Sequence, residues 1–263
     1  MRGAGGALLA KQDAYGQILL AAHEGRPAQE IMERDDGLIY CGDPSDYFAP
    51  FRRWPANERR AMRFVRGRVL DVGCAAGRVS LHLQARGHDV VAIDESPLAV
   101  EVARRRGVRD ARPLALQEVG PGLGSFDTIV LMRNNFGLVG REERAGRLLA
   151  RLAGVTSEHG RIVTDSVDPD RLDDPVFRTY RPRGGGETRP HAQRLRVRFR
   201  DYATPWFFYL MFGPAEMERL VEGTAWRVLR FVDDGSPRFV AVLEKRPASA
   251  RPSRSPRGGA RRR

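Results

Sequence analysis

A short run of small residues, between an apolar stretch and a helix-like stretch, has the composition of a ligand-binding loop. It reads VLDVGCAAGR over residues 69–78, with Asp71 near the end of the apolar run and Gly73 and Gly77 in the loop. Glycine permits positive φ and close approach of the backbone to a ligand, and open α/β sheets bind ligands where their strands end. Asp94 ends the next apolar run, and a carboxylate there can accept hydrogen bonds from a ribose diol. These residues predict a nucleoside site.

The spacing of the loop helps to distinguish between two nucleoside ligands. A dinucleotide pyrophosphate is anionic and is bound by Gly-x-Gly-x-x-Gly, whereas this loop has Ala75 in a Gly-x-x-x-Gly spacing and a carboxylate, Asp71, at its entrance. A ligand with a cationic amino group, a sulfonium and no phosphate is the better electrostatic match. The loop therefore favours S-adenosylmethionine (SAM) over a nicotinamide dinucleotide.

On these motifs the sequence resembles the class I SAM-dependent methyltransferases. The motifs are DVGCAAG at 71–77, VVAIDESP at 90–97, FDTIVLMRNNFGLVG at 126–140, HGRIVTDS at 159–166 and a closing strand pair, GTAWRV and RFVAVLEK. The resemblance covers roughly residues 57–166 and 213–245. The sequence departs from the family at Ala75, where many members have glycine, and around Leu116, where an aspartate is often found.

The resemblance implies a fold, a cofactor and roles for individual residues. The implied fold is α/β, with a Rossmann-like, mostly parallel seven-stranded sheet, a terminal antiparallel hairpin, a helical N-terminal cap and a β insertion after the fifth strand. The implied cofactor is SAM, the product is S-adenosylhomocysteine, and no metal is expected. The cofactor-binding residues implied are Asp71, Gly73, Cys74, Ala75, Gly77, Asp94, Glu95, Ser96, Leu116 and Met132. Asn135 would position the methyl acceptor, and Asn134 would support the same loop.

Apolar periodicity independently predicts the elements that would position these residues. Short apolar runs alternate with amphipathic ones, as in βα units around a parallel sheet. The expected strands are 68–72, 89–93, 110–116, 126–132 and 161–166, with helices at 78–86, 97–106 and 141–153. Two further strands, Trp226–Asp233 and Arg238–Glu244, flank an Asp-Gly-containing turn, so the last strand must be antiparallel to its partner.

The flanking regions are expected to build the acceptor pocket. We divide the chain into a helical and aromatic cap (1–56), a methyltransferase domain (57–245) with a β insertion (167–212), and a basic tail (246–263) too polar to form a core. Within the insertion, Leu195–Phe199 and Trp206–Phe212 could pair as a ribbon. Aromatic side chains suit a small organic acceptor, and the candidates are Tyr15, Tyr40 and Tyr209. Arg133 would either bind a substrate carboxylate or extend to solvent.

Composition excludes several other classes of protein. The net charge is +12, but Lys245–Arg263 holds eight basic and no acidic residues, and 43 of the 45 basic residues in the chain are arginine. This pattern is typical of a GC-rich genome more than of nucleic-acid binding. Two cysteines without CxxC spacing favour a reducing, cytoplasmic location, and no apolar run is long enough to span a membrane.

The alternatives that stay open are a NAD(P)-dependent oxidoreductase and a non-enzymatic SAM-binding or RNA-associated protein. The acceptor is expected to be a small molecule, and the oligomeric state is not predicted.

Overall fold

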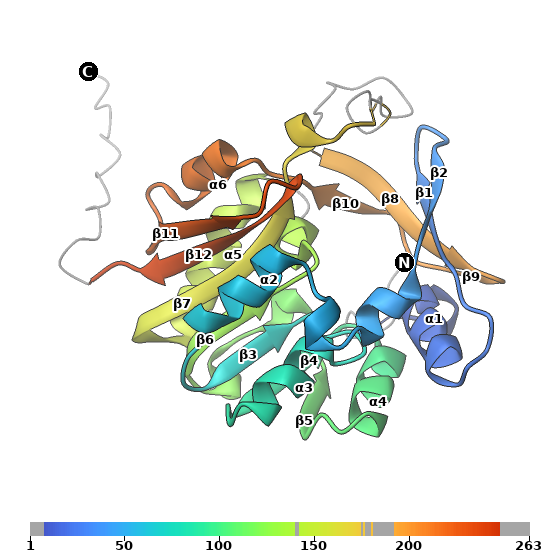
Figure 1. Ribbon diagram of the computed structural model, residues 1–263, viewed down its shortest axis with the longest axis horizontal. Coiled ribbons are helices and arrows are strands. Elements are labelled where there is room, and N and C mark those ends of the chain that lie inside the picture. Colours follow the sequence, from blue (N-terminus) through green and yellow to red (C-terminus); the bar gives the residue numbers. More distant parts are fainter. Residues whose placement is uncertain (1–7, 140–141, 175, 177–179, 181–191, 248–263) are drawn as a thin grey trace, which may run out of the picture.

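A large mixed sheet forms the centre of the computed structural model, which describes residues 8–139, 142–174, 176, 180 and 192–247 (Figure 1). In order across the sheet, its strands are β11 (Trp226–Asp233), β12 (Arg238–Lys245), β7 (Thr156–Val167), β6 (Phe126–Leu131), β3 (Val69–Val72), β4 (Val90–Asp94) and β5 (Asp110–Pro113). The pairs from β7 to β5 are parallel, and β12 is antiparallel to both β7 and β11. The predicted seven-stranded α/β sheet with a terminal hairpin is therefore confirmed.

Helices cover both faces of this sheet, as its apolar strands require. One face carries α2 (Ala56–Ala61), α3 (Arg78–Ala85) and α4 (Pro97–Arg105), and the other carries α5 (Glu142–Gly154) and α6 (Pro214–Val221). The predicted helices begin and end within one residue of α3, α4 and α5. The third strand is shorter than predicted, because the chain turns at Pro113, which cannot donate a ladder hydrogen bond.

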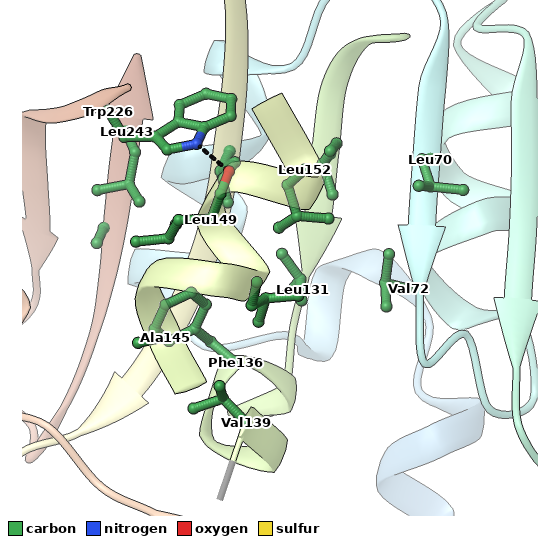
Figure 2. Close-up of a cluster of buried hydrophobic side chains, with 14 of the residues drawn as sticks. Leu70, Val72, Leu131, Phe136, Val139, Ala145, Leu149, Leu152, Trp226 and Leu243 are labelled. Atoms are coloured by element: carbon green, nitrogen blue, oxygen red, sulfur yellow. Dashed lines mark hydrogen bonds between the residues drawn. The ribbon is translucent and has the colours of Figure 1, made fainter. Parts of the chain in front are cut away.

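A hydrophobic core lies on each face of the large sheet. The core between the sheet and α5 is the larger of the two. Phe136, Leu149 and Trp226 are fully buried there, and the Trp226 indole N–H donates to the Leu149 carbonyl oxygen at 2.9 Å (Figure 2). Burial of large apolar side chains is the main favourable term in folding, and the indole hydrogen bond satisfies the one polar group that Trp226 brings into the core.

A second, antiparallel sheet lies beside the carboxyl ends of the parallel strands (Figure 1). Its strands follow the order β10 (Phe207–Leu210), β8 (Ala192–Phe199), β1 (Glu30–Arg34) and β2 (Ile39–Gly42), and β9 (Tyr202–Ala203) pairs with β8. β10 pairs with β8 as a ribbon, but with residues 192–195 and not with the predicted Leu195–Phe199, most of which pairs with β1 and β9. Helix α1 (Ala14–His23) packs on this sheet through Ala14 and Ile18, which join a cluster with Val197 and Phe199.

The cap is less helical than the sequence indicates. Ile31 and Met32 suggest helical periodicity, but burial alternates along β1, with Glu30, Met32 and Arg34 buried. The reason is long-range pairing with β8, which a local pattern does not contain. The described residues also contain no helix long and apolar enough to cross a membrane. Most of the predicted basic tail, residues 248–263, and parts of the insertion between 175 and 191 lie outside the described residues.

Candidate active site

The loop between β3 and α3 has the backbone conformation that its small residues predict. Gly73 and Gly77 have φ values of +71° and +77°, and Ala75 also has a positive φ, of +48°. A Cβ on Gly73 would lie 2.2 Å from Asn135 Nδ2, and one on Gly77 would lie 2.5 Å from Val108 Cγ2. Both glycines are therefore required by conformation and by space.

Asp94 connects this loop to the next strand. Its two carboxylate oxygens accept backbone N–H groups of Ala75 and Ser96, each at 2.9 Å. Burial raises its pKa to about 6, with the two backbone hydrogen bonds acting in the opposite direction. A carboxylate has about four lone-pair positions, so Asp94 can still accept hydrogen bonds from a diol. Ser96 caps α4, accepting the Ala99 N–H at 2.9 Å, and the neighbouring Glu95 is exposed.

Asp71 lies deeper in the site. It is 2% exposed, and the Ser80 hydroxyl donates to it at 2.5 Å. Burial raises the pKa of Asp71 to about 6, against the lowering effects of Ser80 and of the nearby Arg78 guanidinium. A buried carboxylate with a neutral hydrogen-bond donor is a suitable partner for a ligand ammonium group.

Two cavities meet at this loop. The first has a volume of about 400 Å³ and the second about 260 Å³. Both are lined by Tyr15, Gly73, Asn135, Leu138 and Phe207, so they adjoin along these residues.

The predicted site residues divide between the two cavities. The first is lined by Asp71, Cys74, Ala75, Met132, Arg133, Tyr40 and Tyr209, and the second by Asp94, Glu95, Ser96 and Leu116. Two predicted residues, Gly77 and Asn134, line neither cavity. Gly77 instead begins α3 against Val108, so it shapes the loop from behind.

The two asparagines after β6 have different surroundings. Asn134 is fully buried with a φ of +58°; its backbone N–H donates to Asp165 and its side-chain amide donates to the Leu210 carbonyl oxygen, each at 2.7 Å. Asn135 Nδ2 donates to the carbonyl oxygens of Val72 and Gly73 at 2.9 Å, and this side chain lies where the cavities meet. The geometry gives Asn134 a supporting position and brings Asn135 to the site.

Arg133 faces the first cavity more than the solvent. Its guanidinium pairs with Asp46 at 3.0 Å and lies 5.7 Å from the Tyr47 ring centroid, with 30% of the side chain exposed. Its φ of +64° turns the chain sharply after the buried strand. The Tyr209 hydroxyl donates to the Arg133 carbonyl oxygen at 3.2 Å, which ties β10 to this turn.

Several charged residues in the first cavity are not identified by sequence reasoning. They are Glu30, Arg78 and Arg238. Arg78 pairs with buried Glu58 at 2.7 Å, and Arg238 pairs with fully buried Asp165. For Glu30 and Arg238 the available signal is a charged residue at the start of an apolar strand, and for Arg78 it is a position directly after the loop, but only the fold shows that these residues converge on one cavity.

Comparison with known proteins agrees with this geometry. Residues 69–160 match a family described as a methyltransferase domain. Residues 69–160 therefore make up a methyltransferase domain. This assignment confirms the predicted family, and the matched residues include the loop, Asp94 and the turn after β6.

Two curated relatives match part of this chain. A magnesium-protoporphyrin O-methyltransferase from Rhodobacter capsulatus is 37% identical over 100 residues, covering 36% of this chain and 43% of the relative. A ubiquinone biosynthesis O-methyltransferase from Methylocella silvestris is 35% identical over 81 residues, covering 28% of this chain and 32% of the relative. The matches thus span less than half of the length of either relative.

A solved structure matches nearly the whole of this chain. It is a SAM-dependent methyltransferase from Bacteroides fragilis in complex with S-adenosyl-L-homocysteine, with a TM-score of 0.78 and 24% identity over 91% of this chain and 97% of that chain. The likeness therefore extends the shared fold well beyond residues 69–160.

Proposed function

We propose that the protein transfers the methyl group of SAM to an oxygen or nitrogen nucleophile of a small organic molecule. The observation that carries this proposal is the pair of adjoining cavities, one lined by Asp94 and Leu116 and the other by Asp71 and the aromatic residues of the cap. A cofactor lying across both would present its reactive centre where they meet, beside Gly73 and Asn135.

The residues present fit SAM. The oxygens of Asp94 retain lone pairs for the ribose hydroxyls, and Leu114, Leu116 and Trp206 give the second cavity apolar walls for an adenine ring. In the first cavity, the Asp71 carboxylate suits the ammonium group of the methionine moiety and the Arg78 guanidinium suits its carboxylate. No three His, Cys, Asp or Glu side chains in the described part of the chain group together to hold a metal ion.

When bound, SAM supplies a methyl group on a cationic sulfur, so the protein has to align the acceptor with it and shield both from water. Alignment of two reactants can account for about 7–11 kcal/mol of the barrier. The Asn135 side chain is held in one position by its two hydrogen bonds to the loop backbone. It lies where the two cavities meet, and the acceptor would contact it there. Tyr15, Tyr40 and Tyr209 would form the walls of the acceptor site.

The small-molecule acceptor is supported by the shape of the site. The first cavity is lined by side chains of the large sheet, α1, the small antiparallel sheet and the η2 turn (Pro44–Phe48), which leaves room for a compact organic molecule. The names of the two curated relatives indicate small acceptors for those proteins. We place the protein in the cytoplasm, a proposal supported by its two free cysteines.

Incubation with methyl-labelled SAM tests the proposal. Label should pass to the low-molecular-weight fraction of a cell extract and not to its protein or RNA. Transfer to a macromolecular fraction alone would contradict the small-molecule assignment. Binding of NADH without binding of SAM would favour an oxidoreductase instead.

A further inference from the structure

Glu30 brings a buried carboxylate to the wall of the first cavity. It is the first residue of β1 and is 6% exposed. Its partner across the hairpin is Gly42, where a Cβ would lie 2.7 Å from Glu30 Oε2. Glycine at this position therefore leaves the space that the carboxylate occupies.

The direct partners of Glu30 are tyrosine hydroxyls. The Tyr47 hydroxyl donates to it at 3.2 Å, and the Tyr15 hydroxyl on α1 is a second hydrogen-bond donor. No basic side chain in the described residues forms an ion pair with Glu30. This carboxylate lies at a cavity wall and accepts hydrogen bonds only from neutral groups. It therefore retains lone pairs that can accept a further proton.

More distant groups on the surrounding elements also act on this carboxylate. Burial raises the pKa of Glu30 above its ordinary value, and the Asp46 carboxylate on η2 acts in the same direction. The tyrosine hydroxyls and the Arg133 guanidinium after β6 act in the opposite direction. Tyr40, which lies opposite Met32 in the hairpin, remains protonated because burial raises its pKa.

We infer that Glu30 is the catalytic base, which takes the proton of an aromatic hydroxyl group on the acceptor as that oxygen is methylated. This inference rests on the proposed methyl transfer and identifies both a catalytic residue and a class of substrate. The carboxylate lies in the same cavity as Asp71 and Asn135, so an acceptor between them would contact both the base and the cofactor side.

The proton and electron balance of the step is complete without another reactant. The acceptor O–H bond breaks, and its proton passes to a Glu30 oxygen. The electron pair of the acceptor oxygen forms the O–CH₃ bond, and the methyl–sulfur bond breaks with its pair remaining on sulfur. Glu30 then returns the proton to solvent when the product leaves.

The lining of the cavity suits an aromatic acceptor. Tyr40, Tyr209 and Phe207 provide aromatic walls against which a ring can pack. An aromatic hydroxyl has a pKa of about 10, so it is protonated at neutral pH and benefits from a base.

The test uses the full-length protein, SAM and two sets of probes, with Glu30→Gln as the main variant. The probes are the phenols catechol and 2-naphthol and the amines benzylamine and 2-naphthylmethylamine, with methylated products measured by mass spectrometry. Glu33→Gln is the matched control, because Glu33 lies on the same strand but pairs with Arg196 and Arg198 away from the cavity. Glu30→Asp keeps a carboxylate and should recover part of the rate.

We expect wild-type protein to methylate a phenol, and Glu30→Gln to lose about 10²–10⁴-fold in turnover at pH 7 with SAM affinity unchanged. Turnover of the variant should rise with pH toward about 10, as the phenol ionises without assistance. In ligand-free protein, ¹³C NMR of labelled glutamate carboxyls should show a group that titrates above the ordinary range and is missing from Glu30→Gln; burial also raises the pKa of Glu58, and that signal should remain in the variant.

Three results would overturn the inference. They are near-normal turnover by folded Glu30→Gln, methylation of the amines alone, and no methylation of either phenol by wild-type protein that binds SAM. Failure of the wild-type protein to bind SAM at all is a different outcome, because it removes the proposed function and this inference with it.

Discussion

Substitution of Gly73 by alanine should damage both stability and cofactor binding. An alanine there would have to keep a φ of +71°, which costs about 1–2 kcal/mol for a residue with a Cβ. Its Cβ would also lie 2.2 Å from Asn135 Nδ2 and displace that amide from the two carbonyl oxygens that it contacts at 2.9 Å. Each lost hydrogen bond contributes about 0.5–1.5 kcal/mol.

Together these effects predict a loss of about 2–5 kcal/mol in the free energy of unfolding of Gly73→Ala, or a decrease in Tm of about 4–20 °C. SAM affinity should fall at least about tenfold, because the displaced amide enters the junction of the cavities. Thermal unfolding and isothermal titration calorimetry measure the two effects.

Ala75→Gly is the matched control, since Ala75 already has a φ of +48°. Glycine relieves its strain, so we expect Tm to stay the same or to rise by a few degrees. An unchanged Tm and SAM affinity for Gly73→Ala would refute the geometry of the loop.

Three further predictions concern the site and the core. Asp94→Ala should weaken SAM binding at least about tenfold in calorimetry, because it removes the charge-assisted bonds proposed for the ribose, each contributing about 1.5–3 kcal/mol; unchanged affinity would place the ribose elsewhere. Burial raises the pKa of Asp94 to about 6, so the folded state binds more protons than the unfolded state between about pH 4 and 6. The free energy of unfolding of wild type relative to Asp94→Asn should therefore increase, by up to about 3 kcal/mol, as the pH falls from 7 to 4 in denaturant titrations; a decrease would contradict the sign of the shift. Trp226→Phe should lower the free energy of unfolding by about 0.5–1.5 kcal/mol, because it removes the indole hydrogen bond to the Leu149 carbonyl oxygen, and an unchanged denaturation midpoint would argue against that hydrogen bond.

The sequence was sufficient to predict the local structure around the loop and Asp94. A strand, a glycine-containing loop and a helix follow one another over residues 69–85, so their arrangement is local. Asp94 occupies the end of the adjacent parallel strand, and β3 pairs with β4 in the register that brings Val72 beside Ile93. This part of the structure can be predicted from the sequence because βα units are short, local and regular in their hydrophobic periodicity.

The acceptor side could not be predicted in the same way. Glu30 and Arg238 are far apart in the chain, and they reach one cavity only because β1 pairs with β8 and β12 pairs with β7. Carboxylates usually lie at the surface, so a sequence pattern does not predict that Glu30 is buried. The space for its side chain comes from Gly42, and this is seen only once the two strands are paired in the hairpin. Long-range pairing of strands is the physical reason that local patterns miss these residues.

The most direct test of the account is a comparison of SAM and NADH as ligands of the purified protein, by thermal unfolding and calorimetry. SAM at about 100 times its dissociation constant should stabilise the fold by about 2.7 kcal/mol, a rise in Tm of about 5–10 °C, with one site per chain. NADH should leave Tm unchanged. Stabilisation by NADH and none by SAM would contradict the central claim that Asp71, Asp94 and the loop between them form a SAM site.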